Sequence, residues 1–288
     1  MTVFINTCLG LPAATGDSVD ADTLESRCET YAYPVPPQIK ILTFGGDVQG
    51  DRIEIEVVGW GIGEESWNID YKIFYGPTDD LKSPVYAELL NYLQQPLETD
   101  GGKMWIYAGA LDSGFNTQYI YDFIEQNNRR IRCDLIAIKG VGGWQRPDIR
   151  YSRPKRDRGI RSPALWTLAV DKLKQITMRR LARKHKGAGY CHFPVERVDG
   201  EYFNQLASEK LIVNPKTGNL SWEKRDYGGN EAWDCRIYAY GALKIVAPDL
   251  DRPRISSQYG FYKPRKKGQK PSTPRRKRRS PIPSAMGI

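Results

Sequence analysis

Histidine and paired cysteines are scarce in this chain of 288 residues. There are only two histidines, which argues against histidine-based catalysis and histidine-rich metal sites. No CxxC pair occurs, so neither a zinc ribbon nor a disulfide framework is indicated. Cys191 and His192 are neighbours, but a zinc site would need a second pair. We expect unpaired thiols and a reducing compartment, the cytoplasm, for the five cysteines: Cys8, Cys28, Cys133, Cys191 and Cys235.

Three other sequence features are absent. No run of about 18 apolar residues exists, so we expect neither a membrane span nor a membrane partner. The N-terminus lacks a basic segment followed by an apolar core, so it does not resemble a signal peptide. The phosphate-binding pattern GxxxxGK[ST] is also missing, since DGGKMW and PKTGNLS have only fragments of it. We therefore expect no ATP hydrolysis by this chain alone.

Positive charge is concentrated near the C-terminus. The segment 263–279 holds ten of the 43 Lys and Arg residues and no acid. The rest of the chain has 33 basic against 34 acidic residues, a net charge of −1. A Pro-rich, apolar-poor segment of this kind does not fold alone, but it can bind polyanions. We predict a linker-like lead-in over 1–38, a folded domain over 39–250 and a basic disordered tail over 251–288.

The first half of the domain predicts a mixed sheet. Strands are expected over 39–47, 52–60 and 65–76, joined by short turns into an antiparallel meander. In 52–60, apolar and acidic residues alternate, which is typical of a half-buried strand. Helices are expected over 83–97 and 116–128, each followed by a strand, at 103–112 and 132–140. Strand–helix–strand connections favour parallel pairing. The prediction is an α/β fold with strand order 3-2-1-4-5.

The second half is expected to be mainly helical. A loop is predicted over 141–160, then helices over 163–184, 199–213 and 230–246. A strand or hairpin arm is predicted over 218–226. The basic stretches 150–161 and 179–186 are candidates for contact with a DNA backbone, or for docking other proteins.

Acidic residues follow two neighbouring parallel strands of this sheet. Asp47 ends the first strand and Asp112 ends the fourth, so both should lie at the same edge. The last helix offers Glu231 and Asp234, three residues apart on one helical face. Clustered carboxylates need cations, and hard oxygen ligands favour Mg²⁺ or Mn²⁺. Two such ions about 4 Å apart support phosphodiester hydrolysis, which is nuclease chemistry.

Each acid also has a purely structural explanation. Asp47 can begin the turn DVQGD, and Asp112 with Ser113 and Gly114 can form a turn or a helix cap. Glu231 and Asp234 can complement the dipole in the first turn of a helix. The spacing alone does not decide between these explanations and a metal site.

The motifs together resemble a known family. These motifs are GGDVQGDRIEIEVVGW, DSGFNTQYIYDFI, AIKG, YCHFP, EYFNQLASEKL and NEAWDCRIYAYGALKI, in this order. Over about 3–247 the chain resembles the endonuclease domain of the large terminase subunit of lambda-type tailed phages. FINTCLGLP resembles the segment that joins that family's ATPase motor to its nuclease.

The resemblance implies an RNase H-like fold and metal-dependent cleavage of double-stranded DNA during genome packaging in the bacterial host. It implies Asp47, Asp112 and Asp234 as catalytic metal ligands, with Glu231 as the alternative to Asp234. Lys139 of AIKG is expected either to contact the scissile phosphate or to be a solvated strand end. Implied partners are the small terminase subunit, the portal protein of the procapsid and a separate ATPase motor chain.

The missing phosphate-binding loop departs from the family pattern. It suggests a nuclease half, from a split gene, a remnant or a shortened chain. A non-catalytic docking module and an RNase H-like recombination nuclease stay open as alternatives.

Overall fold

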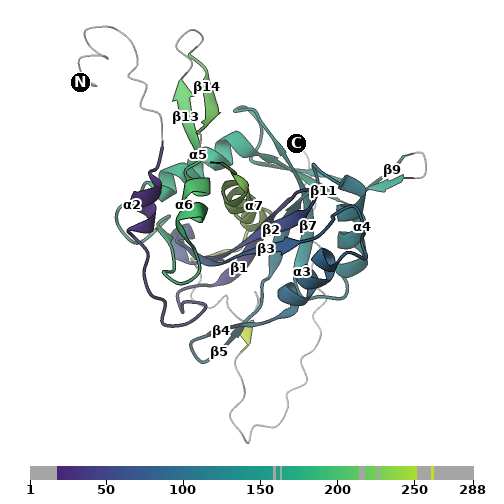
Figure 1. Ribbon diagram of the computed structural model, residues 1–288, viewed down its shortest axis with the longest axis horizontal. Coiled ribbons are helices and arrows are strands. Elements are labelled where there is room, and N and C mark those ends of the chain that lie inside the picture. The colour runs from purple at the N-terminus through teal and green to yellow at the C-terminus, as the bar shows by residue number, and fades with distance from the viewer. Residues whose placement is uncertain are drawn as a thin grey trace, which may run out of the picture.

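The computed structural model describes residues 18–157, 160–162, 164–213, 218–225, 228–251 and 261–262. Its centre is an eight-stranded sheet (Figure 1). From one edge to the other the strands are β12 (Cys191–His192), β3 (Ser66–Tyr75), β2 (Arg52–Trp60), β1 (Ile41–Val48), β6 (Ala108–Asp112), β7 (Asp134–Val141), β11 (Leu165–Ala169) and β8 (Ile149–Ser152).

The strand order 3-2-1-4-5 is confirmed. The strands β1, β2 and β3 form an antiparallel meander, as their short connections predicted. The strand β6 pairs in parallel with β1, and β7 pairs in parallel with β6. The chain is thus an α/β protein with the strand order expected of an RNase H-like sheet, extended by β12 on one side and by β11 and β8 on the other.

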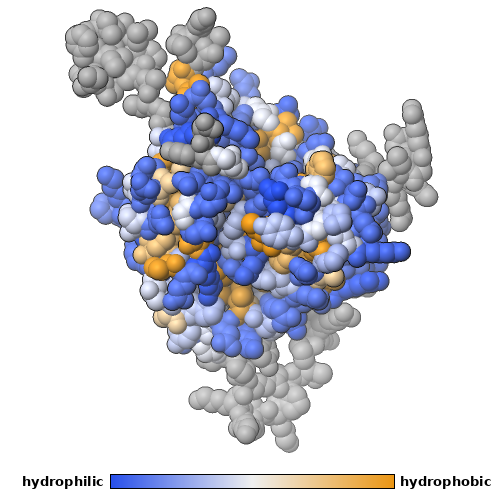
Figure 2. Space-filling model, viewed as in Figure 1, coloured by the Kyte–Doolittle hydropathy of each residue, from blue (hydrophilic) through white to orange (hydrophobic). Residues whose placement is uncertain are grey.

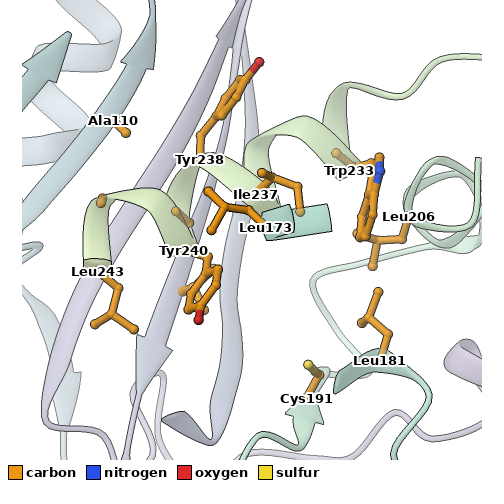
Figure 3. Packing of buried hydrophobic residues seen from close by; sticks show 14 of the residues in the cluster. Ala110, Leu173, Leu181, Cys191, Leu206, Trp233, Ile237, Tyr238, Tyr240 and Leu243 are labelled. Atoms are coloured by element: carbon orange, nitrogen blue, oxygen red, sulfur yellow. The ribbon is translucent and has the colours of Figure 1, made fainter. Parts of the chain in front are cut away.

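Helices cover both faces of the sheet. One face is covered by α7 (Glu231–Val246), with α5 (Val170–Leu181), α6 (Gly200–Leu206) and α2 (Ala21–Glu25) packed around it (Figure 1). The other face is covered by α3 (Pro84–Gln94) and α4 (Thr117–Asn127). Figure 3 shows Trp233, Ile237 and Tyr240 of α7 among side chains from neighbouring helices. Burial of both sheet faces supplies the main driving force for folding.

The helix α7 lies unusually close to β1. A Cβ atom at Gly45 would lie 2.0 Å from the carbonyl oxygen of Cys235 and 2.3 Å from the nitrogen of Ala239. Two residues earlier on β1, the hydroxyl of Thr43 donates to the carbonyl of Ala239 at 2.9 Å. Only glycine allows this approach, which packs the middle of α7 against the middle of β1.

Two predicted helices are wrong in part, because each contains a strand. Within the predicted helix 163–184, Leu165–Ala169 form β11 and Val170–Leu181 form α5. The strand β11 lies between β7 and β8, and its residues Trp166 and Leu168 are buried. Residues 199–213 form α6 and then β13 (Glu209–Val213), which pairs with β14 (Leu220–Lys224). In each segment a short strand adjoins a helix. Pairing with a neighbouring strand determines the structure of that part of the segment, in spite of its helical sequence pattern.

Three further segments differ from expectation. The predicted loop 141–160 includes β8 and β9 (Lys155–Asp157), which pairs with β10 (Ile160–Ser162). The predicted strand 103–112 is two strands, because β5 (Gly102–Met104) pairs with β4 (Leu97–Thr99) and only β6 joins the main sheet. Within the predicted lead-in, residues 21–25 form α2, and Leu24 of α2 and Val35 are buried.

The prediction that β2 is half-buried is wrong. Glu54 and Glu56 alternate with apolar residues, but they are 2% and 0% exposed, because α6 and α7 cover their face. The carboxylate of Glu56 pairs with Arg236 at 3.1 Å and accepts hydrogen bonds from Asn68 and Tyr202, both at 2.7 Å. A buried charge is tolerated when it is paired and hydrogen-bonded in this way.

The domain boundaries at residues 38 and 250 stay predictions. Most of the basic tail lies outside the described residues; within it, β15 (Phe261–Tyr262) pairs with β5. In the described part of the chain, no helix is long and apolar enough to span a bilayer. Figure 2 shows a mainly hydrophilic face with small, separate hydrophobic areas.

Candidate active site

Asp47 and Asp112 lie side by side at the edge where β1 and β6 end. The strands pair in parallel, with Gly46 opposite Leu111, so the next residues on both are these two acids. Side chains alternate along a strand, and Asp47 and Asp112 fall on the face that α7 covers. The predicted convergence of these two carboxylates at one edge of the sheet is present in the structure.

The first turns of α7 bring Asp234 and Glu231 toward the same edge. Both acids lie near the N-terminus of α7, which packs against β1 through Gly45. The negative charge of Asp234 acts on both Asp47 and Asp112, whereas Glu231 acts on Asp47. Glu231 pairs at 3.2 Å with Arg52, which also contacts Glu54 and Asp51.

The electrostatics at this edge favour protonated carboxyls in the absence of a cation. Burial raises the pKa of Asp47 to about 7; the hydrogen bond from Gln49 opposes this, and the nearby acids add to it. Burial also raises the pKa of Asp112, against hydrogen bonds from the backbone of Gly114 and Ser113. The pKa of Asp234 is raised by burial in spite of Lys174. Perturbed acids of this kind are typical of functional sites.

A divalent cation suits this donor set. Carboxylate oxygens are the ligands that Mg²⁺ and Mn²⁺ prefer, and a cation would relieve the repulsion among the acids. The Oδ1 atom of Asp112 is buried and has no hydrogen-bond partner, as expected of an atom that accepts a ligand. The group therefore fits a cation in charge and donor type.

The side chains described here are not yet arranged around a metal. Among the described residues, no three His, Cys, Asp or Glu side chains form a group that could hold one. Asp47 accepts a hydrogen bond from Gln49 at 2.5 Å. The two carboxylate oxygens of Asp234 contact Lys174 at 3.3 Å and Asn230 at 2.8 Å. A cation that binds Asp234 therefore has to compete with the ammonium group of Lys174.

Residues 1–255 match the family model described as "Terminase large subunit gpA, endonuclease domain". The chain belongs to this family. It is 31% identical over 254 residues to the large terminase subunit of Escherichia phage lambda, covering 84% of this chain and 38% of that protein. It is 27% identical over 261 residues to the large subunit of Enterobacteria phage P21, covering 85% and 39%. The chain thus spans about two fifths of the length of these relatives.

Solved terminase structures are similar at low sequence identity. The nuclease domain of the Sf6 large subunit, as a K428A mutant with manganese, is 10% identical with a TM-score of 0.45, and the match covers 76% of this chain and 96% of that one. The large terminase of bacteriophage HK97 is 10% identical with a TM-score of 0.43, and the match covers 84% and 47%.

Lys139 of the terminase domain is exposed at the end of β7. Its neighbours Ile138 and Ala137 belong to the cores on opposite faces of the sheet, so alternation places Lys139 on the face away from α7. Its positive charge nonetheless lowers the pKa of Asp112, against the dominant effect of burial. Lys139 is therefore close to the site without sharing the face of its acids.

The basic residues in the two predicted DNA-contact stretches are not all free to contact DNA. In 179–186, Arg180 pairs with Glu64 and lies over the ring of Tyr240, with 4.4 Å between guanidinium carbon and ring centroid. Arg180 therefore has a structural role, whereas Arg183 and Lys184 are exposed. The stretch 150–161 overlaps β8, β9 and β10, and residues 158 and 159 lie outside the described residues.

Sequence reasoning missed two residues that adjoin the site. Lys174 of α5 contacts Asp234, and it also contacts both carboxylate oxygens of Glu209 at 2.8 Å. Glu209 begins β13, in a segment predicted to be helical. In the sequence, Lys174 is one of several basic residues on a predicted helix, and nothing marks it out as the one that contacts Asp234. The imidazole of His192, beside Cys191, is buried, and its two nitrogens contact Glu29 and Glu65.

Proposed function

We propose that this domain hydrolyses phosphodiester bonds of double-stranded DNA, with two Mg²⁺ or Mn²⁺ ions held by Asp47, Asp112 and Asp234. The observation that carries the proposal is the pairing of Asp47 and Asp112 at one edge of the sheet, with α7 bringing Asp234 toward them. When bound, the metal supplies an activated water and stabilises the leaving oxygen. The family match supports cleavage as the activity.

The residues of the chain contribute in different ways. Asp112 offers its unpartnered Oδ1 atom, and Asp47 is held in position by Gln49. We prefer Asp234 to Glu231 as the third ligand, because the charge of Asp234 raises the pKa of both Asp47 and Asp112, whereas that of Glu231 acts on Asp47. Lys139, at the end of β7, is a candidate to contact a DNA phosphate at the cut.

The wider role proposed is DNA cutting during phage genome packaging in the host cell. The partners proposed are those implied by the family: double-stranded DNA, the small terminase subunit, the portal protein and an ATPase motor acting on the same DNA. The 288 residues contain no GxxxxGK[ST] pattern, so we propose that they do not hydrolyse ATP by themselves.

Cleavage of supercoiled plasmid DNA tests the proposal. The purified chain is incubated with Mn²⁺, with EDTA, and as the Asp112→Asn variant. We expect nicking or linearisation in Mn²⁺, none in EDTA, and a loss of more than about 100-fold in the variant, since a lost ligand costs more than a lost outer-shell contact. Asp100→Asn is the control, because Asp100 is exposed in the turn between β4 and β5.

The second candidate is a non-catalytic docking module, which one observation favours: Asp234 is paired with Lys174 rather than placed in a metal-ready group. A folded protein that cuts no DNA in Mn²⁺ or Mg²⁺, even with a terminase motor added, would support this candidate.

A further inference from the structure

Phe115 is an exposed aromatic side chain on the loop that follows Asp112. It is 50% exposed, although it lies only three residues after a carboxylate of the candidate site. Single exposed apolar side chains are common on protein surfaces. The inference therefore depends on how the loop holds this ring and on what lies beside it.

The loop is anchored on both sides of Phe115. The backbone nitrogen and the hydroxyl of Ser113 both donate to the carbonyl of Ile138, at 2.9 and 2.8 Å. Asn116 has a left-handed backbone with φ of 45°, and its side chain donates to the hydroxyl of Thr78 at 2.8 Å instead of capping α4. Asparagine is one of the few residues besides glycine that adopt this conformation readily, and the contact with Thr78 holds it here. The exposure of the ring is thus built into the loop.

The ring also lies beside the turn that follows Asp47. A Cβ atom at Gly50 would be 3.7 Å from the Cε1 and Cζ atoms of Phe115. The same turn is tied to the Asn116 contact, because the hydroxyl of Thr78 donates to the carbonyl of Gln49 at 2.5 Å. The ring of Phe115, on the loop that follows Asp112, therefore lies against the turn that follows Asp47.

We propose that Phe115 stacks on a DNA base next to the bond that is cut, opening the duplex step there. The inference rests on the proposed function, because a phosphodiester held at Asp47 and Asp112 brings its flanking nucleotides to this edge. Apolar side chains inserted between base pairs unstack them, and aromatic rings stack on any base. Phenylalanine has no hydrogen-bonding group, so this contact positions the DNA without reading its sequence.

The test separates DNA binding from cleavage. Binding of a short duplex is measured by fluorescence anisotropy in the Asp112→Asn background, with and without Phe115→Ala, and cleavage is measured in the otherwise wild-type chain. We expect Phe115→Ala to weaken binding about 10-fold, the loss of one base–aromatic stack, and Phe115→Trp to retain it. The salt dependence of binding should be unchanged, since no phosphate contact is removed.

A mismatched base pair supplies a second readout. A mismatch lowers the energy needed to unstack a step but leaves the base–aromatic stack in place, so wild-type binding should strengthen on such DNA and the defect of Phe115→Ala should be at least as large as on matched DNA. Tyr33→Ala, which removes an aromatic side chain that is 40% exposed before β1, is the control. Equal binding by Phe115→Ala and the parent, or equal loss in the Trp variant, would overturn the inference. If the wild-type chain cuts no DNA, the proposed function fails, while the binding comparison still decides the role of Phe115.

Discussion

At the scale of single residues, the buried acids of the candidate site lower the stability of the folded state when no cation is bound. Asp47 and Asp112 are acids with raised pKa values, and burial is the main cause for each. A site that stores such repulsion gains stability when a cation binds, because the cation binds the folded state and not the unfolded one. Substitutions that remove one of the charges at this site should therefore change stability differently with and without a cation.

Asp47→Asn should stabilise the metal-free protein at high pH. The pKa of Asp47 is about 7 in the folded state against 3.8 for an ordinary aspartate, so the folded state holds the extra proton between these values. The free energy of unfolding of the wild type therefore falls as the pH rises through this window. In EDTA at pH 8 we expect the variant to be about 2–3 kcal/mol more stable, and near pH 4 about equal. Urea unfolding at both pH values measures the difference; a gain independent of pH would contradict the account.

Lys174→Met should destabilise the protein more without metal than with it. The substitution leaves Glu209 and Asp234 without their common cation, and removal of one partner of a buried pair costs about 3 kcal/mol. Mn²⁺ should reduce this loss by compensating Asp234. Lys210→Met is the matched control: its pair with Glu223 is exposed on both sides and should contribute less than about 1 kcal/mol. Thermal unfolding in EDTA and in Mn²⁺ tests this, and an equal loss in both would contradict it.

At the scale of elements, the site depends on the close contact of β1 with α7. Gly45→Ala should lower the free energy of unfolding by about 3 kcal/mol, because the added methyl group would meet the backbone of Cys235 and Ala239. Gly50→Ala is the control, since a Cβ there would make only ordinary contacts at 3.7 Å. Urea denaturation of both variants measures this; similar stability of the two would show that α7 can move away from β1.

Some elements of the fold could be predicted from the sequence and others could not. The meander, the two parallel strands and α7 have long patterns and clear turns, so their order followed from the sequence. The strands β11 and β13 adjoin helices, and only their partners β7 and β14 show that they are strands. The burial of Glu54 and Glu56 could not be predicted either, because alternation along β2 does not reveal that helices cover both faces.

At the scale of the whole molecule, the site combines residues from opposite ends of the domain. Asp47 and Asp112 could be placed together from strand order alone, since parallel neighbours end at one edge. Asp234 is more than 100 residues further along, and its contact with Lys174 depends on the packing of α5 and α7, which no local pattern encodes. Of the sequence features, only the family resemblance implies that Asp234 joins Asp47 and Asp112.

Isothermal titration of the chain with Mn²⁺ tests the central claim most directly, because it measures the cation at the carboxylates without requiring DNA or a motor. We expect the wild type and Asp100→Asn to bind alike, and Asp112→Asn to bind at least about 10-fold more weakly, since it removes one negatively charged ligand. Equal binding by Asp112→Asn and the wild type, or no binding by the folded wild type, would contradict the claim that Asp47, Asp112 and Asp234 form a metal site.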